Sequence, residues 1–185
     1  LDEFDRVPSG SLTRSRGEVL VSSIVTLFKK IRFDTHENLG WGPVTLPELE
    51  MQTTAAWWTL PEWLERDYER EPVKNAMIGL AHILRHIAPM YLMCAAQDVR
   101  VVYHVRDPFT GRPTIYLYDS IPGGVGLSER VFEMDKEIFR QAQEVLAACP
   151  CENGCPSCVG ATAGDGAKAT LMDVLERILS EDMQA

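Results

Sequence analysis

The residues best suited to chemistry in this chain are four cysteines within one run of ten residues: Cys149, Cys151, Cys155 and Cys158. Their spacing is C-x-C, three further residues, and then C-x-x-C. Short arcs of this kind let thiolates converge on one cation, and tetrahedral Zn²⁺ at about 2.3 Å from each sulfur is the commonest occupant. Gly154 and Pro156 flank Cys155 and supply a tight turn with a rigid exit. The spacing therefore predicts one zinc ion, and four protein ligands make it structural because no position is left for a catalytic water.

Other uses of these thiols have to be weighed against zinc. The C-x-C pair closes too small a ring for an unstrained disulfide, and cysteines this crowded do not meet the required Cα separations in two pairs. A redox C-x-x-C leaves Cys149 and Cys151 without a role. An iron–sulfur cluster uses the same ligands and remains the chemical alternative. The fifth cysteine, Cys94, lies in an apolar run and is interpreted as a core residue, with a part in the metal site left open.

A second candidate site is the glycine turn formed by Gly123, Gly124 and Gly126, between an expected strand and an expected helix. Backbone amides at such a helix start can hold a phosphate or a carboxylate. The alternative is that the glycines only let the chain turn sharply. The turn is not a Walker A loop, whose Gly-x-x-x-x-Gly-Lys pattern occurs nowhere in the sequence. Without that phosphate cradle, these 185 residues alone are not expected to hydrolyse ATP.

Charge argues against a dedicated nucleic-acid-binding protein, because the formal net charge of the 185 residues is −9. Local groups can still contact nucleic acid. The basic group is Lys29, Lys30 and Arg32, and the aromatic pair Trp57 and Trp58 is a candidate stacking platform for bases. The alternatives are solvated charge on a strand edge and a packed core strand. His82 and His86 are four residues apart on an expected helix, and we interpret them as core or surface histidines.

The hydrophobic pattern predicts an α+β fold of antiparallel strands and hairpins with packed helices. The expected strands are 18–33, 44–60, 98–106 and 113–119, and residues 35–43 are expected to form a hairpin loop. The expected helices are 61–70, a longer one from Pro72, one that ends at Ala148, and 167–180. No apolar run reaches the roughly 18 residues of a membrane span, and no signal peptide is present. Clustered free thiols favour the cytoplasm, and a start other than Met suggests a piece of a longer protein.

Two sequence features together carry a family resemblance. Residues 118–127 pass through the glycine turn, and residues 149–160 read Cys-Pro-Cys-Glu-Asn-Gly-Cys-Pro-Ser-Cys-Val-Gly. This combination resembles the MZB domain, the zinc-binding domain of the mitomycin repair factor A helicases. Residues 33–40 and 46–54 resemble the region that precedes that domain, so the likeness extends from about Glu18 to Gly160. The resemblance implies that residues 61–185 are the zinc-binding domain and that residues 1–60 are an extended strand and hairpin segment leading from a helicase core.

The function that the resemblance implies is that of an accessory domain in a superfamily 2, DEAD/DEAH-like helicase. Helicases of this kind unwind DNA from 3′ to 5′ with ATP during DNA repair, so the implied partners are DNA and the motor domains of the same polypeptide. The four family cysteines correspond to Cys149, Cys151, Cys155 and Cys158. Two alternatives remain: a protein-interaction module, and a free-standing enzyme that uses the glycine turn with Asp119, His36 or Glu37 as acid–base groups.

Overall fold

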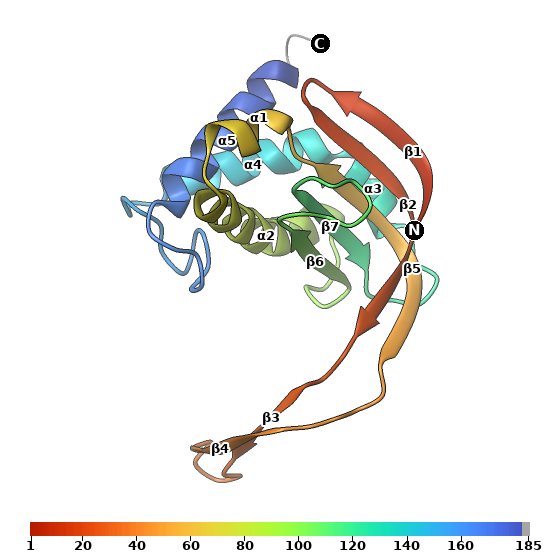
Figure 1. Cartoon of the computed structure of the whole chain (residues 1–185), viewed down its shortest axis with the longest axis vertical. Coiled ribbons are helices and arrows are strands. Elements are labelled where there is room, and N and C mark those ends of the chain that lie inside the picture. The colour runs from red at the N-terminus through yellow and green to blue at the C-terminus, as the bar shows by residue number, and fades with distance from the viewer. Residues whose placement is uncertain (183–185) are drawn as a thin grey trace.

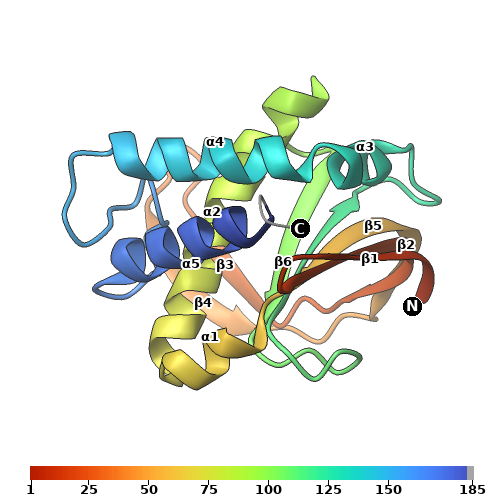
Figure 2. The ribbon, with the colours of Figure 1, turned by 90° about the horizontal axis from the view of Figure 1, so that it is seen from above.

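The computed structural model describes residues 1–182 and has one five-stranded antiparallel sheet in the order β1-β2-β5-β7-β6. The strands are β1 (Asp2–Ser9), β2 (Leu12–Ser23), β5 (Leu49–Thr59), β7 (Thr114–Asp119) and β6 (Val99–His104). The helices are α1 (Glu62–Asp67), α2 (Arg70–Leu92), α3 (Leu127–Glu133), α4 (Asp135–Ala148) and α5 (Ala167–Asp182). The helices gather on one side of the sheet (Figures 1 and 2). The α+β prediction is confirmed.

The sheet has two buried faces, and strand β5 shows why. Its alternate side chains point to opposite sides of the sheet. Ala56 and Trp58 belong to the main core beneath the helices, whereas Ala55 and Trp57 pack with Tyr116 on the opposite face. The Trp57 and Tyr116 rings stack with their centroids 5.6 Å apart. Residues 55–58 of β5 therefore contribute buried side chains to both faces of the sheet.

The sheet also joins the two segments expected from the sequence. Strand β5, before residue 60, pairs with β7, after residue 61, from Ala55 opposite Tyr118 to Thr59 opposite Thr114. Strands from both segments thus contribute to one sheet and one core. Strand β1 was not expected, because its residues are mostly charged or polar and it lies at an edge, where few side chains are buried.

The expected helix from the glycine turn to Ala148 is divided in two. Helix α3 ends at Glu133, Met134 caps both helices, and α4 starts at Asp135. The carboxylate of Asp135 is 2% exposed and accepts bonds from the Trp58 Nε1–H at 3.1 Å and the Arg14 guanidinium at 2.9 Å. Burial raises the pKa of Asp135, and both donors oppose that rise by stabilising the charged form. The break lets one carboxylate link β2, β5 and α4.

Two further strands form a separate ribbon. Strands β3 (Leu27–Ile31) and β4 (Asn38–Pro43) pair only with each other, and the continuations of β2 and β5 carry them away from the helices (Figure 1). The expected strand 18–33 is therefore interrupted between Ser23 and Leu27, and the expected loop 35–43 contains β4. None of the helices within residues 1–182 combines the length and the apolar character needed to cross a bilayer.

Candidate metal centre and nucleic-acid surface

The four cysteines converge between the end of α4 and the start of α5. Cys149 is the C-terminal cap of α4, and the ten-residue run then folds back toward α5. The four Sγ atoms all lie within 4.8 Å of one another. The Sγ–Sγ distances are 3.4 Å for Cys149–Cys151, 3.6 Å for Cys149–Cys155, 3.5 Å for Cys151–Cys158 and 3.7 Å for Cys155–Cys158.

These distances fit a metal and do not fit disulfides. Four sulfurs at about 2.3 Å from a central ion lie about 3.8 Å apart at the corners of a tetrahedron. A disulfide needs sulfurs about 2.05 Å apart, and all five cysteines are free thiols. Cys94 is not a member of this group of sulfurs. It packs against the core, where burial raises the pKa of its thiol.

The backbone tunes the thiols for metal binding. The amides of Cys158 and Ser157, with the Cys149 side chain, lower the pKa of the Cys155 thiol to about 6. Burial raises the pKa of Cys158 to about 12, so that thiol loses its proton when a cation offers compensating charge. Gly154 has φ +113°, and a Cβ there would lie 2.7 Å from Val159 Cγ2. Glycine is therefore required at the turn between the two cysteine pairs.

Side chains from two helices hold this loop from outside the sulfur cluster. The Lys168 ammonium of α5 donates to the backbone carbonyls of Cys149 at 2.6 Å and Cys151 at 2.7 Å. His82 of α2 places Nε2 3.2 Å from the Ser157 carbonyl, and its ring fills the space left by Gly160. His82, expected to be a core or surface residue, thus contacts the metal loop. His86 packs edge-on against the His82 ring, with the two ring centroids 4.7 Å apart. Sequence spacing gave no signal for Lys168.

The glycine turn binds an anion that belongs to the protein itself. The carboxylate of Asp119, which is 0% exposed, accepts backbone N–H bonds from Val125 at 2.7 Å, Leu127 at 3.1 Å and Ser128 at 2.7 Å. The Leu127 and Ser128 amides are at the start of α3 and the Val125 amide is in the turn before it, so the place that a phosphate would occupy holds a side chain. Gly124 has φ +73°, and a Cβ there would lie 2.2 Å from Thr54 Oγ1. The structural reading of Gly123, Gly124 and Gly126 is therefore the one that the contacts support.

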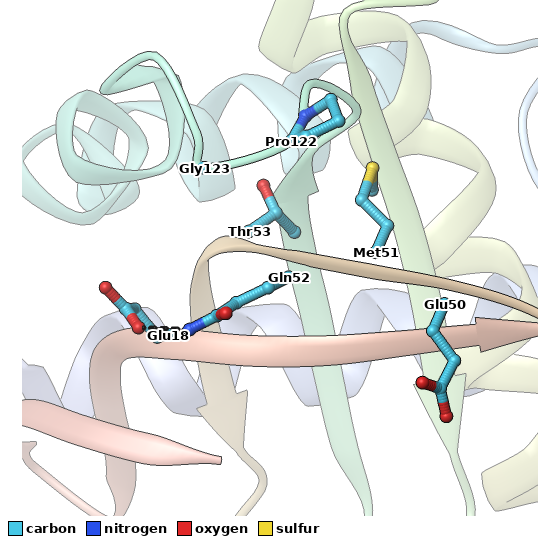
Figure 3. Close-up of a pocket in the computed structure, with 7 residues that line it drawn as sticks. All are labelled: Glu18, Glu50, Met51, Gln52, Thr53, Pro122 and Gly123. Carbon is cyan, nitrogen blue, oxygen red and sulfur yellow. Dashed lines mark hydrogen bonds between the residues drawn. The ribbon is translucent and has the colours of Figure 1, made fainter.

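A hollow of about 570 Å³ lies beside this turn (Figure 3). Its lining residues come from β2, β5 and the turn: Glu18, Glu50, Met51, Gln52, Thr53, Pro122 and Gly123. The side-chain amide of Gln52 donates a hydrogen bond to the Glu18 carboxylate at 2.8 Å. The backbone N–H of Gly123 donates to the backbone carbonyl of Gln52, also at 2.8 Å. Two carboxylates and no basic side chain line the hollow, so it does not suit a phosphate.

Trp57 and Trp58, a candidate stacking platform, belong instead to a packed core strand, which is the interpretation that the sequence favours for this segment. Their side chains are 2% and 1% exposed, respectively. Trp57 stacks on Tyr116, and Trp58 meets the edge of Phe139 at 5.3 Å. Neither indole has a free face for a base, because alternation in β5 directs one into each of the two cores.

The basic group lies on the ribbon and is exposed. Lys29 and Lys30 are in β3, and Arg32 follows that strand. The Lys29 ammonium lies 5.7 Å from the Trp41 ring centroid, and Arg32 pairs with Glu37 at 3.1 Å. No ion pair of Lys30 is found among residues 1–182. Trp41, which the sequence placed in a loop, is an exposed aromatic residue beside Lys29, and Phe28 and Phe33 next to the basic group are exposed as well.

The groups proposed for a free-standing enzyme do not come together. Asp119 is buried at the end of β7, where three amides occupy its carboxylate. His36 and Glu37 lie in the loop at the tip of the ribbon, which extends away from β7 (Figure 1). Asp119 is therefore not paired with His36 or Glu37 as an acid–base catalyst.

Comparison with known proteins agrees with this geometry. Residues 80–159 match the family model of MZB, the MrfA Zn-binding domain. The chain is 39% identical over 178 residues to the ATP-dependent helicase YprA of Bacillus subtilis, covering 95% of this chain and 24% of that protein. It is 23% identical over 128 residues to the ATP-dependent helicase HRQ1 of Saccharomyces cerevisiae, covering 63% of this chain and 12% of that protein.

Solved structures give the same result. The DUF1998 helicase MrfA bound to DNA superimposes with a TM-score of 0.79 at 37% identity, covering 96% of this chain and 24% of that one. A second crystal structure of the DUF1998 helicase MrfA gives a TM-score of 0.66 at 33% identity, covering 97% of this chain and 22% of that one. The chain thus spans about a quarter of the length of YprA and MrfA.

The match to a zinc-binding family also bears on the choice of metal. The matched residues include all four clustered cysteines, and the sulfur geometry fits one structural zinc ion. An iron–sulfur cluster has no such support. Residues 80–159 are thus similar to the MZB family, and the chain is similar over nearly its whole length to one part of the ATP-dependent helicase YprA.

Proposed function

We propose that this chain is the zinc-bearing accessory part of an ATP-dependent 3′-to-5′ DNA helicase that acts in DNA repair in the cytoplasm. The observation that carries the proposal is the 39% identity to the helicase YprA over 95% of the chain. The match to MrfA bound to DNA supports DNA as the partner. ATP binding and hydrolysis belong to motor domains elsewhere in the same polypeptide, because no phosphate cradle occurs in these 185 residues.

The proposed role of the zinc is to fix the end of α4 against α5 and α2. Cys149, Cys151, Cys155 and Cys158 hold the ion, and no ligand position is left for a substrate. The ion sets the shape of the domain and takes no part in the reaction of ATP or DNA.

The proposed DNA contact is the basic group of the ribbon: Lys29, Lys30 and Arg32. Residues 27–43 carry these three cations against two carboxylates, Asp34 and Glu37, in a chain whose formal net charge is −9. The ribbon is therefore the part of the molecule best suited to approach a phosphate backbone. A ribbon beside the motor can guide one strand and so couple translocation to strand separation.

The test is a charge change in the full-length parent helicase. The double variant K30Q/R32Q is expected to lower unwinding per ATP hydrolysed and to reduce the salt slope of DNA binding by about two, one per lost phosphate contact. The matched control K74Q/R140Q removes two cations from helices of the body and is expected to leave both quantities unchanged. Equal unwinding per ATP in both variants would exclude the guiding role and favour a protein-interaction module.

A second measurement concerns the 185-residue chain alone. Purified free of other proteins, it is expected to show no DNA-stimulated ATPase activity and only weak, salt-sensitive DNA binding. ATP hydrolysis that persists through repeated purification contradicts the assignment of the motor to other parts of the polypeptide.

A further inference from the structure

The two faces of the β3–β4 ribbon are chemically different. In antiparallel pairing, directly opposed residues share a face. Leu27 is opposite Pro43 and Lys29 is opposite Trp41, and Ile31 shares their side of β3 by alternation. The other face carries Phe28 opposite Gly42 and Lys30 opposite Gly40. We call the side that bears Leu27, Ile31 and Trp41 the apolar face.

The apolar face is exposed. Leu27 is 59% exposed, Ile31 53% and Trp41 67%. The arms that join the ribbon to the body continue the pattern with further exposed apolar side chains: Ile24, Val25, Leu46 and Leu49. The glycines of the opposite face let the Phe28 ring lie flat over Gly42, where a Cβ would be 2.5 Å from the ring. The opposite face exposes Phe28 at 42%, so the paired strands expose Leu27, Ile31 and Trp41 on one side against Phe28 on the other.

A ribbon of this kind requires a covering surface. A two-stranded hairpin is marginally stable in water on its own, and a contiguous exposed apolar patch marks an interaction site. Within residues 1–182, β3 and β4 hydrogen-bond only to each other as strands, and neither belongs to a buried core cluster. Among these residues, the apolar face of the ribbon therefore has no buried core to cover it.

The chemistry of the face favours protein over DNA. Leu27 and Ile31 can neither stack on a base nor bind a phosphate. The one cation on this side, Lys29, has its ammonium over the Trp41 ring. Lys30, by contrast, projects from the opposite face. The two faces can thus serve two partners at once, with protein on the apolar side and DNA on the Lys30 side.

The remainder of the same polypeptide is the partner that this surface fits. The chain covers only 24% of YprA and 24% of the DNA-bound MrfA chain, so most of a homologous helicase lies outside these residues. A surface on the same chain is present at high effective concentration and needs no bimolecular encounter. We propose that the apolar face of the ribbon docks into an apolar groove of the parent helicase outside this segment. The inference rests on the proposed function, since that function supplies the parent polypeptide.

Site-specific photo-crosslinking in the full-length parent protein tests this docking. One variant carries p-benzoylphenylalanine in place of Trp41 on the apolar face. The matched control carries it in place of Lys30, one position along β3 from Lys29, on the opposite face. After irradiation without DNA, the Trp41 position is expected to form a crosslinked peptide pair within one chain, to residues outside this segment. The Lys30 position is expected to form none.

Other crosslinks would overturn the proposal. A dimer band assigns the face to a second copy, a crosslink that forms only with DNA assigns it to nucleic acid, and the absence of any crosslink leaves the face in solvent. A second readout is proteolysis: L27A/W41A is expected to speed cleavage of the ribbon in the parent protein, whereas F28A on the opposite face is not. Unwinding by the unsubstituted parent protein is measured separately. Absence of unwinding would contradict the proposed helicase function, whereas absence of the Trp41 crosslink in an active helicase would contradict only the docking proposal.

Discussion

At the scale of single residues, the sulfur cluster predicts a sharp difference between two cysteines. C155S removes a ligand whose thiol has a pKa lowered to about 6. It is expected to abolish tight zinc binding and to lower the free energy of unfolding by about 3 kcal/mol or more, because metal binding contributes to folding. C94S changes a partly buried thiol outside the cluster and is expected to cost about 1 kcal/mol. Elemental analysis and urea unfolding measure both, and equal losses in the two variants contradict the zinc assignment.

Asp119 provides the second residue-scale prediction. D119N keeps the shape of the side chain but loses the charge that three backbone amides bind. The expected loss is about 3 kcal/mol of unfolding free energy, since hydrogen bonds to charged groups contribute more than neutral ones. The control D98N alters a carboxylate with one amide partner at an exposed turn, and about 1 kcal/mol is expected there. Added inorganic phosphate should not raise the stability of the unsubstituted chain, and stabilisation by phosphate would reopen the anion-site reading of the glycine turn.

At the scale of elements, the ribbon is separate from the structure that holds the zinc. Strands β3 and β4 form their own sheet, while the metal loop contacts α2 and α5. Replacing residues 27–43 by a short Gly-Ser turn is therefore expected to leave zinc content unchanged and the Tm of the 185-residue chain within about 4 °C of the original. Calorimetry and metal analysis test this. A large fall in Tm would mean that the ribbon supports the fold and is not only an interaction element.

At the scale of the whole molecule, zinc removal is expected to destabilise the segment between α4 and α5 and to leave the sheet folded. The sheet and the helices share an extensive apolar core that does not depend on the metal. The segment between α4 and α5 is held by the ion, by Lys168 and His82, and by the burial of Cys158 and Val159 in the core. After chelation, amides 149–168 should exchange hydrogen faster, while those of β2, β5 and β7 keep their protection. Uniform loss of protection across the sheet would show that the metal supports the entire fold.

Local sequence determined the features whose partners are close along the chain. The four cysteines span ten residues, so short turns alone bring their sulfurs together, and the metal centre could be predicted without a fold. Periodicity likewise predicted α2, α5 and the β6–β7 hairpin, because each depends on neighbours a few residues away. The family resemblance, based on the same local motifs, is confirmed by the match of residues 80–159 to the MZB family model.

Only the tertiary structure decided features that depend on distant partners. Trp57 and Trp58 are equivalent in sequence. Because β5 pairs with β2 on one side and β7 on the other, the two side chains point to opposite faces of the sheet and pack in different cores. Asp135 is the first residue of α4, and the donors to its buried carboxylate, Arg14 and Trp58, are 121 and 77 residues away. Strand β1 and the ribbon likewise depend on pairing between backbones, which composition does not encode. Long-range pairing is chosen by the free energy of the entire core, so no short window of sequence contains the information that decides it.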